Sequence, residues 1–335
     1  MIFKRNILYH LLLPSVFCKQ TSMSSLHKRV QYYSDNMLRL QGVVGHNEQL
    51  NNILFVSGKS AGNLKRKHVI FFPGDVQNYR DKMASHFSNN KWTDWCYENT
   101  ATLLASKFPQ AWTWIIEPIK MHDGIFSCYD NFLTANLLGA PENLDNHDAL
   151  LHLKVLLRSA VTLVNEHLDG TKQEQVCELE SDPCENDESP VSTMDSKGIN
   201  ADLPIVIIGF SKGCVVLNQF LHELHLAEDN PELKKFIERI SAWYWLDGGH
   251  SKETDTWITN EQVLHDLTKL KTTIHVHVTP YQVKDKNRPH IGEEERMFVE
   301  TLKRIGADVT ETIHFEDEER SLTNHFKVLE KLPDD

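Results

Sequence analysis

One serine in the sequence lies where it could act as a nucleophile. The segment LPIVIIGFSKGCVVLNQF, residues 203–220, starts as an apolar run of strand formers and continues as a helical pattern. Between the two halves stands Gly-Phe-Ser-Lys-Gly, with Ser211 at its centre. A sharp turn from strand to helix needs neighbours without side-chain bulk, and it lifts the serine hydroxyl clear of the sheet. The stretch predicts an exposed nucleophile, with an ordinary tight turn as the alternative.

Strands and helices alternate along most of the chain, and these elements would position the serine. The runs VIFF and IVII lack the period-2 alternation of a half-exposed strand, which fits strands buried on both faces. Further strands are expected at residues 241–246, 273–278 and 309–315, with helices between them. Such alternation implies right-handed crossovers and a mostly parallel sheet covered by helices on both faces. The predicted fold class is α/β, a single domain over residues 35–335.

An acidic stretch at residues 169–202 interrupts this pattern. It contains QEQVCELESDPCENDESPVSTMDSKG, which has serine and proline but almost nothing apolar to bury. Because a strand resumes directly after it, we interpret the stretch as a disordered insertion within the domain and not as a domain boundary.

The strand, the Gly-x-Ser-x-Gly turn and the helix resemble the α/β-hydrolase superfamily, over roughly residues 40–333. The resemblance implies a chain order of serine, acid and histidine. It gives Ser211 the place of the nucleophile and His325, in SLTNHFKV after the last predicted strand, the place of the base. For the acid it points first to Asp285, after the penultimate strand, with Asp247 at the tip of the preceding strand as the alternative. Otherwise Asp285 is a solvated loop charge and Asp247 a turn former.

The same resemblance implies an oxyanion hole. Pro73, Gly74 and Asp75 follow the strand after which lipases and esterases carry an HG-type loop, with proline here in place of histidine. The residues of this hole would be Gly74, Asp75 and Lys212, with the backbone N–H groups of Asp75 and Lys212 facing the developing negative charge. The side chain of Lys212 could bind an acidic group of a substrate, or it is a solvated lysine at a helix start.

Several longer segments of the sequence make the resemblance more specific than the superfamily. GFSKGCVVLNQ, SCYDNF, YWLDGGHS, HVTPYQV and NHF are similar to a family of animal mitochondrial hydrolase-like proteins, known in humans from an open reading frame on chromosome 2. The family resemblance implies a mitochondrial location and serine esterase activity. It also suggests a link to mitochondrial respiration and, through the glycogen branching enzyme as a partner, to glycogen metabolism.

The first 34 residues have the composition of an organelle transit peptide. No acidic residue precedes Asp35, and the segment carries these basic residues: Lys4, Arg5, Lys19, Lys28 and Arg29. The alternative is a secretory signal with its apolar region at residues 7–17, but His10 and Pro14 interrupt that region and no A-x-A-like cleavage site follows. We therefore predict import into the mitochondrial matrix, with secretion as the alternative.

Composition excludes several classes of protein. At 335 residues and 40% hydrophobic, the chain can bury a large core without disulfides or metal. The net charge of −12 argues against a nucleic-acid partner, and no run of 18 apolar residues predicts a transmembrane helix. The six cysteines show no CxxC pair, as expected of reduced thiols. The pairs His275/His277 and His222/His225 lack further ligands, so we expect neither a metal nor a cofactor.

Two functions from different classes are consistent with these features. A serine hydrolase for carboxylic esters or thioesters would use Ser211, His325 and an aspartate to form an acyl-enzyme that water resolves. A hydrolase-derived binding or scaffold protein would keep the fold without turnover. The complete set of serine, aspartate and histidine in the right order favours the hydrolase, whose substrate would be a small acyl or lipid-like molecule.

Overall fold

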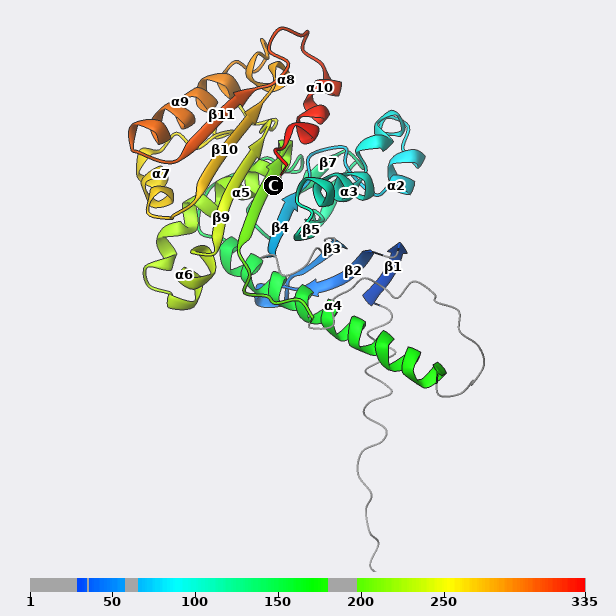
Figure 1. Cartoon of the computed structure of the whole chain (residues 1–335). Helices are drawn as coiled ribbons and strands as arrows, with labels where there is room; N and C mark the ends of the chain where they lie inside the picture. Colours follow the sequence, from blue (N-terminus) through cyan, green and yellow to red (C-terminus); the bar gives the residue numbers. More distant parts are fainter. Residues whose placement is uncertain (1–28, 35, 58–65, 180–197, 335) are drawn as a thin grey trace, which may run out of the picture.

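The chain is described by a computed structural model that covers residues 29–34, 36–57, 66–179 and 198–334. Within these residues nine strands form one sheet in the order β1-β2-β3-β5-β4-β8-β9-β10-β11, which spans the molecule in Figure 1. The strands are β1 (Val30–Ser34), β2 (Met37–Val44), β3 (Leu50–Val56), β4 (Lys67–Phe72), β5 (Ala111–Ile116), β8 (Ile205–Phe210), β9 (Ile240–Leu246), β10 (Thr273–Val278) and β11 (Val309–Ile313). From β5 to β11 the neighbours run parallel, whereas β1, β2 and β3 pair antiparallel.

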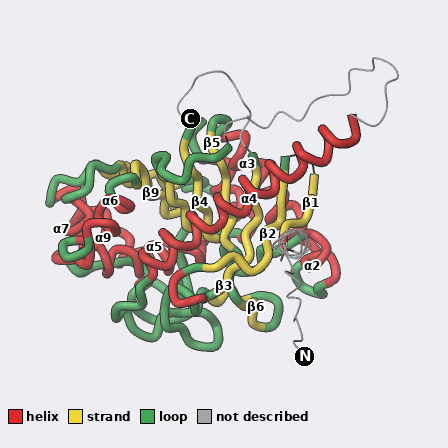
Figure 2. The backbone as a smooth tube through the Cα atoms, turned by 90° about the horizontal axis from the view of Figure 1, so that it is seen from below, coloured by secondary structure: helices red, strands yellow, loops and turns green. Residues whose placement is uncertain are grey.

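Helices cover both faces of the sheet. They are α2 (Arg80–Ser85), α3 (Tyr97–Lys107), α4 (Ala149–Leu179), α5 (Cys214–Glu223), α6 (Pro231–Ile237), α7 (Glu261–Thr268), α8 (Pro280–Val283), α9 (His290–Arg304) and α10 (Leu322–Lys327). Figure 2 shows α4 and α5 running across one face, where α4 packs against β2 and α5 against β8. On the other face α3 packs against β3 and β5.

The central strands are apolar along their whole length because each face of the sheet packs against its own hydrophobic core. Along β8, Ile205 and Ile207 belong to one buried cluster, and the alternate residues Val206, Ile208 and Phe210 belong to the other. Every residue of this strand is buried, as a strand between two helical layers requires. The predicted α/β fold class, a mostly parallel sheet with helices on both faces, is confirmed.

Two segments contain structure that the sequence pattern does not indicate. The repeat of apolar residues at helical spacing ends near Leu168, but α4 continues to Leu179, into the predicted insertion. Residues 180–197 of that insertion lie outside the described residues. The segment 119–146 has no periodic pattern, but it contains a hairpin of β6 (Lys120–His122) and β7 (Phe126–Cys128), whose strands are too short to show a period.

The sheet also begins inside the segment assigned to the leader. β1 pairs with β2, and Val30 is buried opposite Leu40 although the rest of β1 is exposed. A leader ending at residue 34 would therefore include β1, which is an edge strand of the sheet. No helix among the described residues is both long and apolar enough to cross a membrane.

This position of β1 predicts where the leader is removed. We expect the mature protein in mitochondria to begin after Met1 and no later than Val30, because later cleavage would expose the β2 edge that β1 covers. Fractionation followed by N-terminal sequencing measures this. A mature chain that starts at Met1 or after Val30, or one found in the secretory pathway, would contradict it.

One buried carboxyl group predicts a pH-dependent stability. Glu295 on α9 is 4% exposed, and within the described residues its Oε1 has no hydrogen-bond partner. Burial, with smaller contributions from the charges of Glu311 and Asp247, raises the pKa of Glu295 from 4.5 to about 7. The folded state therefore holds a proton that the unfolded chain releases, so stability falls as the pH rises from 4.5 to about 7.

Glu295→Gln should remove this loss of stability, because the amide stays neutral. Above pH 7 the variant is expected to be more stable than the native protein by up to about 3 kcal/mol, the free energy equivalent of the pKa shift. Urea unfolding at pH 5 and pH 8 measures the difference. Glu300→Gln, on the same helix but 65% exposed, is the matched control and should keep the native pH dependence. An unchanged pH dependence in Glu295→Gln would refute the assignment.

Candidate active site

Ser211 lies on a sharp turn between β8 and α5, as the sequence predicts. The strand ends at Phe210, a single 3-10 turn spans Ser211–Gly213, and α5 begins at Cys214. The φ angle of Ser211 is 51°, a strained value for a residue with a side chain. A Cβ atom on Gly213 would lie 2.0 Å from the carbonyl oxygen of Phe72, so only glycine allows this close approach. The turn brings Ser211 to the carboxyl edge of the sheet.

Asp247 lies next to this turn. β9 pairs with β8 so that Leu246 is opposite Phe210, and the residues that follow, Asp247 and Ser211, are neighbours at the same edge. Asp247 is fully buried, and its φ angle of 48° is also strained. Its Oδ2 lies 2.6 Å from Nδ1 of His325. The two oxygens also accept hydrogen bonds from Thr279, at 2.7 Å from its N–H and 2.6 Å from its hydroxyl.

His325 is fixed by its helix and by two aromatic rings. Ser321 caps α10, and the N–H of His325 donates to the carbonyl oxygen of Ser321 at 3.2 Å. The imidazole centroid lies 4.8 Å from the ring of Phe210 and 4.7 Å from that of Tyr281 on α8. Helices α8 and α10 contact each other and lie close together in Figure 1. The ring therefore has little freedom to turn away from Asp247.

Asp285, the first choice for the acid on sequence, has different partners. Its Oδ2 accepts hydrogen bonds from Arg288 Nε at 2.9 Å and from Arg320 Nη2 at 2.6 Å. Burial raises the pKa of Asp285, but a hydrogen bond from the N–H of Asn287 and the two guanidinium groups outweigh burial and hold it below the usual range. Asp247, and not Asp285, is thus the aspartate that is hydrogen-bonded to His325. Through its ion pair with Arg320, Asp285 instead links the loop before α10 to the residues that follow α8.

The serine and the histidine are not joined by a hydrogen bond. His325 uses Nδ1 for Asp247, which leaves Nε2 as the atom that could accept the serine proton. Both side chains are buried, so Ser211 is not exposed as the sequence predicted. Among the described residues Ser211 Oγ makes no hydrogen bond to this nitrogen. Such bonds are often long in a free enzyme and tighten when substrate binds.

Several backbone groups of the loop after β4 are hydrogen-bonded. The carbonyl oxygen of Pro73 accepts from the hydroxyl of Tyr129 at 2.6 Å. The N–H of Gly74 donates to Gln77 Oε1 at 3.0 Å, and its carbonyl oxygen accepts from Ser127 Oγ at 2.8 Å. The N–H of Gly74, a residue predicted to belong to the oxyanion hole, therefore already has an acceptor.

The backbone N–H groups near Ser211 differ in whether they already have an acceptor. Val76, whose φ angle of 72° is strained, donates its N–H to the carbonyl oxygen of Ile125 at 2.7 Å. The N–H groups of Asp75 and Lys212 have no acceptor among the described residues. That of Lys212 belongs to the first turn of a helix, where N–H groups have no intrahelical partner. The loop touches the serine closely, since a Cβ on Gly74 would lie 2.7 Å from Ser211 Cβ.

The side chain of Lys212 is buried, so the interpretation of it as a solvated lysine is wrong. It is 1% exposed, and its Nζ lies 3.2 Å from Asp75 Oδ2 and donates to the carbonyl oxygen of Leu138 at 2.6 Å. Burial raises the pKa of the Asp75 carboxyl group, against the opposing charge of Lys212. Ser127 donates its N–H to the other oxygen of Asp75 at 2.8 Å.

Several residues of the site were not singled out on sequence. Gln77, Ser127 and Tyr129 hold the loop after β4, and Tyr281 packs on His325. Only Thr279 had a local signal, because it caps α8 directly before a proline and accepts a hydrogen bond from Tyr281 N. The others act through contacts between distant parts of the chain.

The histidines that invited a metal hypothesis do not form a ligand cluster. Nδ1 of His277 lies 2.8 Å from Nε2 of His314, and His275 stacks on Tyr244. In the part of the chain that the structure describes, no group of three or more His, Cys, Asp or Glu side chains could hold a metal ion.

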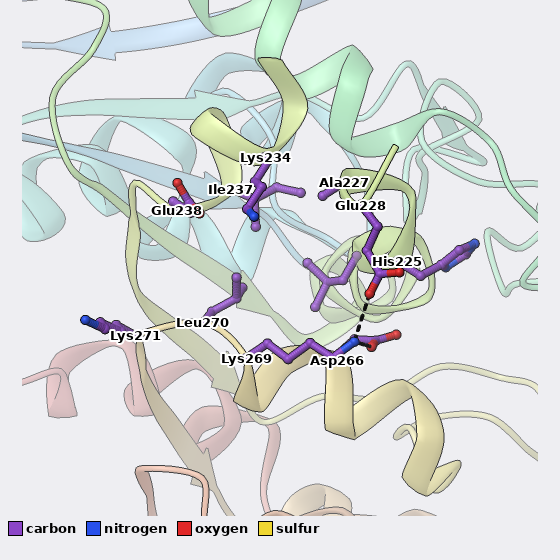
Figure 3. Close-up of a pocket in the computed structure, with 11 residues that line it drawn as sticks. His225, Ala227, Glu228, Lys234, Ile237, Glu238, Asp266, Lys269, Leu270 and Lys271 are labelled. Carbon is purple, nitrogen blue, oxygen red and sulfur yellow. Dashed lines mark hydrogen bonds and ion pairs between the residues drawn. The ribbon is translucent and has the colours of Figure 1, made fainter. Parts of the chain in front are cut away.

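A cavity of about 470 Å³ lies away from this site (Figure 3). It is lined by the turn after α5 and by the ends of α6 and α7. Lys269 crosses part of it, 3.0 Å from Glu228 and 2.7 Å from Asp266. Because α5 runs back from the carboxyl edge and α6 and α7 lead into the starts of β9 and β10, the cavity is at the amino edge, opposite Ser211.

Solved structures with a similar arrangement include esterases. Esterase Est22 is 12% identical, with a TM-score of 0.43, over 94% of this chain and 84% of that one. Enterochelin esterase from Shigella flexneri is 11% identical, with a TM-score of 0.45, over 90% of this chain and 59% of that one.

Relatives at higher identity are mitochondrial proteins. The human mitochondrial protein C2orf69 is 38% identical over 330 residues, covering 88% of this chain and 86% of the human protein. The homologue from Mus musculus is 39% identical over 314 residues, with coverage of 88% and 86%. These relatives confirm the predicted mitochondrial location. The model of the C2orf69 family matches residues 39–308, and the chain therefore belongs to the C2orf69 family.

Proposed function

We propose that this protein is a mitochondrial serine hydrolase that cleaves a carboxylic ester or thioester through an acyl-enzyme. The observation that carries the proposal is the buried contact of 2.6 Å between Asp247 and His325, at the edge of the sheet where Ser211 stands on a strained turn. A histidine oriented by a carboxylate beside a serine is the arrangement that activates a hydroxyl as a nucleophile.

Each side chain has one task in this reaction. Asp247 accepts the Nδ1–H of His325, which fixes the tautomer with a free lone pair on Nε2. Nε2 takes the proton of Ser211 as Oγ attacks the acyl carbon, and it then gives that proton to the leaving alcohol or thiol. Water activated by the same nitrogen resolves the acyl-enzyme and regenerates the serine.

The negative charge of the tetrahedral intermediate needs donors that are already in place. The N–H groups of Asp75 and Lys212 support this role, because they lie beside Ser211 and have no acceptor among the described residues. The N–H of Gly74 does not contribute, since Gln77 already accepts it. Each such donor is worth about 10²- to 10³-fold in kcat in other hydrolases.

The test is hydrolysis of a series of p-nitrophenyl esters and acyl thioesters of increasing chain length by the purified full chain. Turnover of at least one class above the rate of Ser211→Ala supports the proposal, and the best chain length defines the acyl pocket. A folded protein that turns over none of them at more than the rate of that variant would favour a hydrolase-fold binding or scaffold protein instead. The links to respiration and to the glycogen branching enzyme rest on the family resemblance alone and stay predictions.

A further inference from the structure

The two residues whose N–H groups would form the oxyanion hole are also joined to each other through their side chains. Nζ of Lys212 lies 3.2 Å from Oδ2 of Asp75, and the lysine is 1% exposed. One residue belongs to the turn that carries Ser211, and the other belongs to the loop after β4. The ion pair therefore joins the turn that carries Ser211 to the loop after β4.

Each partner also contacts residues between Phe126 and Leu138. The second oxygen of Asp75 accepts the N–H of Ser127 on β7 at 2.8 Å. The ammonium group of Lys212 donates to the carbonyl oxygen of Leu138 at 2.6 Å, and it lies 5.8 Å from the ring centroid of Phe126. The pair thus fixes the nucleophile turn, the loop after β4 and the hairpin of β6 and β7 relative to one another.

Stability alone is a poor reason for such a pair. Lys212 is buried and the Asp75 side chain is 26% exposed. Taking a charge out of water costs about as much as the attraction to its partner returns, and apolar side chains of similar size often stabilise a fold equally well. An ion pair fixes the distance and the relative orientation of the two backbone segments that carry it better than an apolar contact does. Those are the quantities on which an oxyanion hole depends, since its donors must already point at the developing charge.

We propose that the Lys212–Asp75 ion pair is a positioning device that sets the spacing of the two oxyanion-hole N–H groups. The inference rests on the proposed function. The side chains touch neither the nucleophile proton nor the leaving group, so they act through the backbone donors of their own residues. Losing the pair should therefore slow the chemical step and leave substrate binding nearly unchanged.

The experiment compares Lys212→Met, Asp75→Asn and the double variant, with kcat and KM measured on an ester that the full-length native protein hydrolyses. Each single variant should lower kcat by about 10- to 100-fold, less than complete loss of a donor, and change KM by less than about threefold. The double variant should be no slower than the slower single variant, because the two side chains act as a unit. Lys212→Arg keeps the charge and should recover most of the rate lost in Lys212→Met.

A matched control is the exposed pair Lys235 and Glu232 on α6, 2.9 Å apart. Lys235→Met and Glu232→Gln should keep the native kcat. Thermal denaturation checks that each variant is folded, and Asp75→Asn carries the test if Lys212→Met is not, since the amide oxygen can still accept from Ser127. Native kcat in folded variants, or losses that multiply in the double variant, would overturn the inference. A native protein without turnover would overturn the proposed function and this inference with it.

Discussion

Asp247→Asn is expected to lower kcat by about 10⁴-fold while the protein stays folded. The carboxylate accepts the Nδ1–H of His325 at 2.6 Å, and an asparagine can turn its amide toward this nitrogen and stabilise the wrong tautomer. His325 would then present a proton at Nε2 and could not act as the base. The measurement is kcat with the best ester, together with circular dichroism to follow folding.

Asp285→Asn is the matched control for this prediction. Both aspartates are buried and both follow strands at the carboxyl edge, but Asp285 pairs with Arg288 and Arg320. Its replacement should lower the melting temperature, because two guanidinium groups lose their common partner, while kcat changes by less than about tenfold. A large loss of kcat in Asp285→Asn with little effect in Asp247→Asn would show that the acid is the other aspartate.

Ser211→Ala and His325→Ala should each reduce kcat by about 10⁶-fold, and the double variant should lose little more. The two side chains perform one proton transfer, so removing either one removes the whole step. Ser241→Ala and His265→Ala are the controls, since Ser241 lies at the amino end of β9 and His265 is an exposed residue of α7. Loss of turnover in the controls, or its survival in Ser211→Ala, would contradict the assignment.

The strand, turn and helix around Ser211 could be predicted from the sequence, because the residues that indicate them all lie in one short segment. The apolar run of β8, the two glycines and the helical pattern of α5 lie within 20 residues of one another. The position of His325 could be predicted as well, because the resemblance implies a histidine after the last strand. The close approach of Gly213 to Phe72 explains why the turn requires glycine there.

The choice between the aspartates depended on contacts that no local pattern contains. Arg320 is 35 residues from Asp285 in the chain, and His325 is 78 residues from Asp247. The sequence therefore ranked Asp285 first only because it follows the penultimate strand, where the resemblance to the superfamily places the acid. The register of β8 and β9, which sets Asp247 beside Ser211, decides the geometry and becomes visible only in the folded sheet.

The burial and ion pair of Lys212 could not be predicted either, because its partners are distant in the sequence. A lysine at a helix start is usually solvated, and only the fold brings Asp75 and Leu138 to its ammonium group. The hairpin of β6 and β7 escaped detection because each strand has three residues. Short elements and long-range ion pairs are the two features that periodicity does not report.

The most direct test of the central claim is labelling of the native protein with a fluorophosphonate probe, followed by peptide mapping. The probe reacts only where an activated serine, its base and an oxyanion hole occur together, so it needs no knowledge of the substrate. The expected result is one adduct on Ser211, absent from His325→Ala and strongly slowed in Asp247→Asn. A folded native protein that stays unlabelled, or that carries the adduct on another residue, would contradict the assignment of Ser211 as the nucleophile of a serine hydrolase.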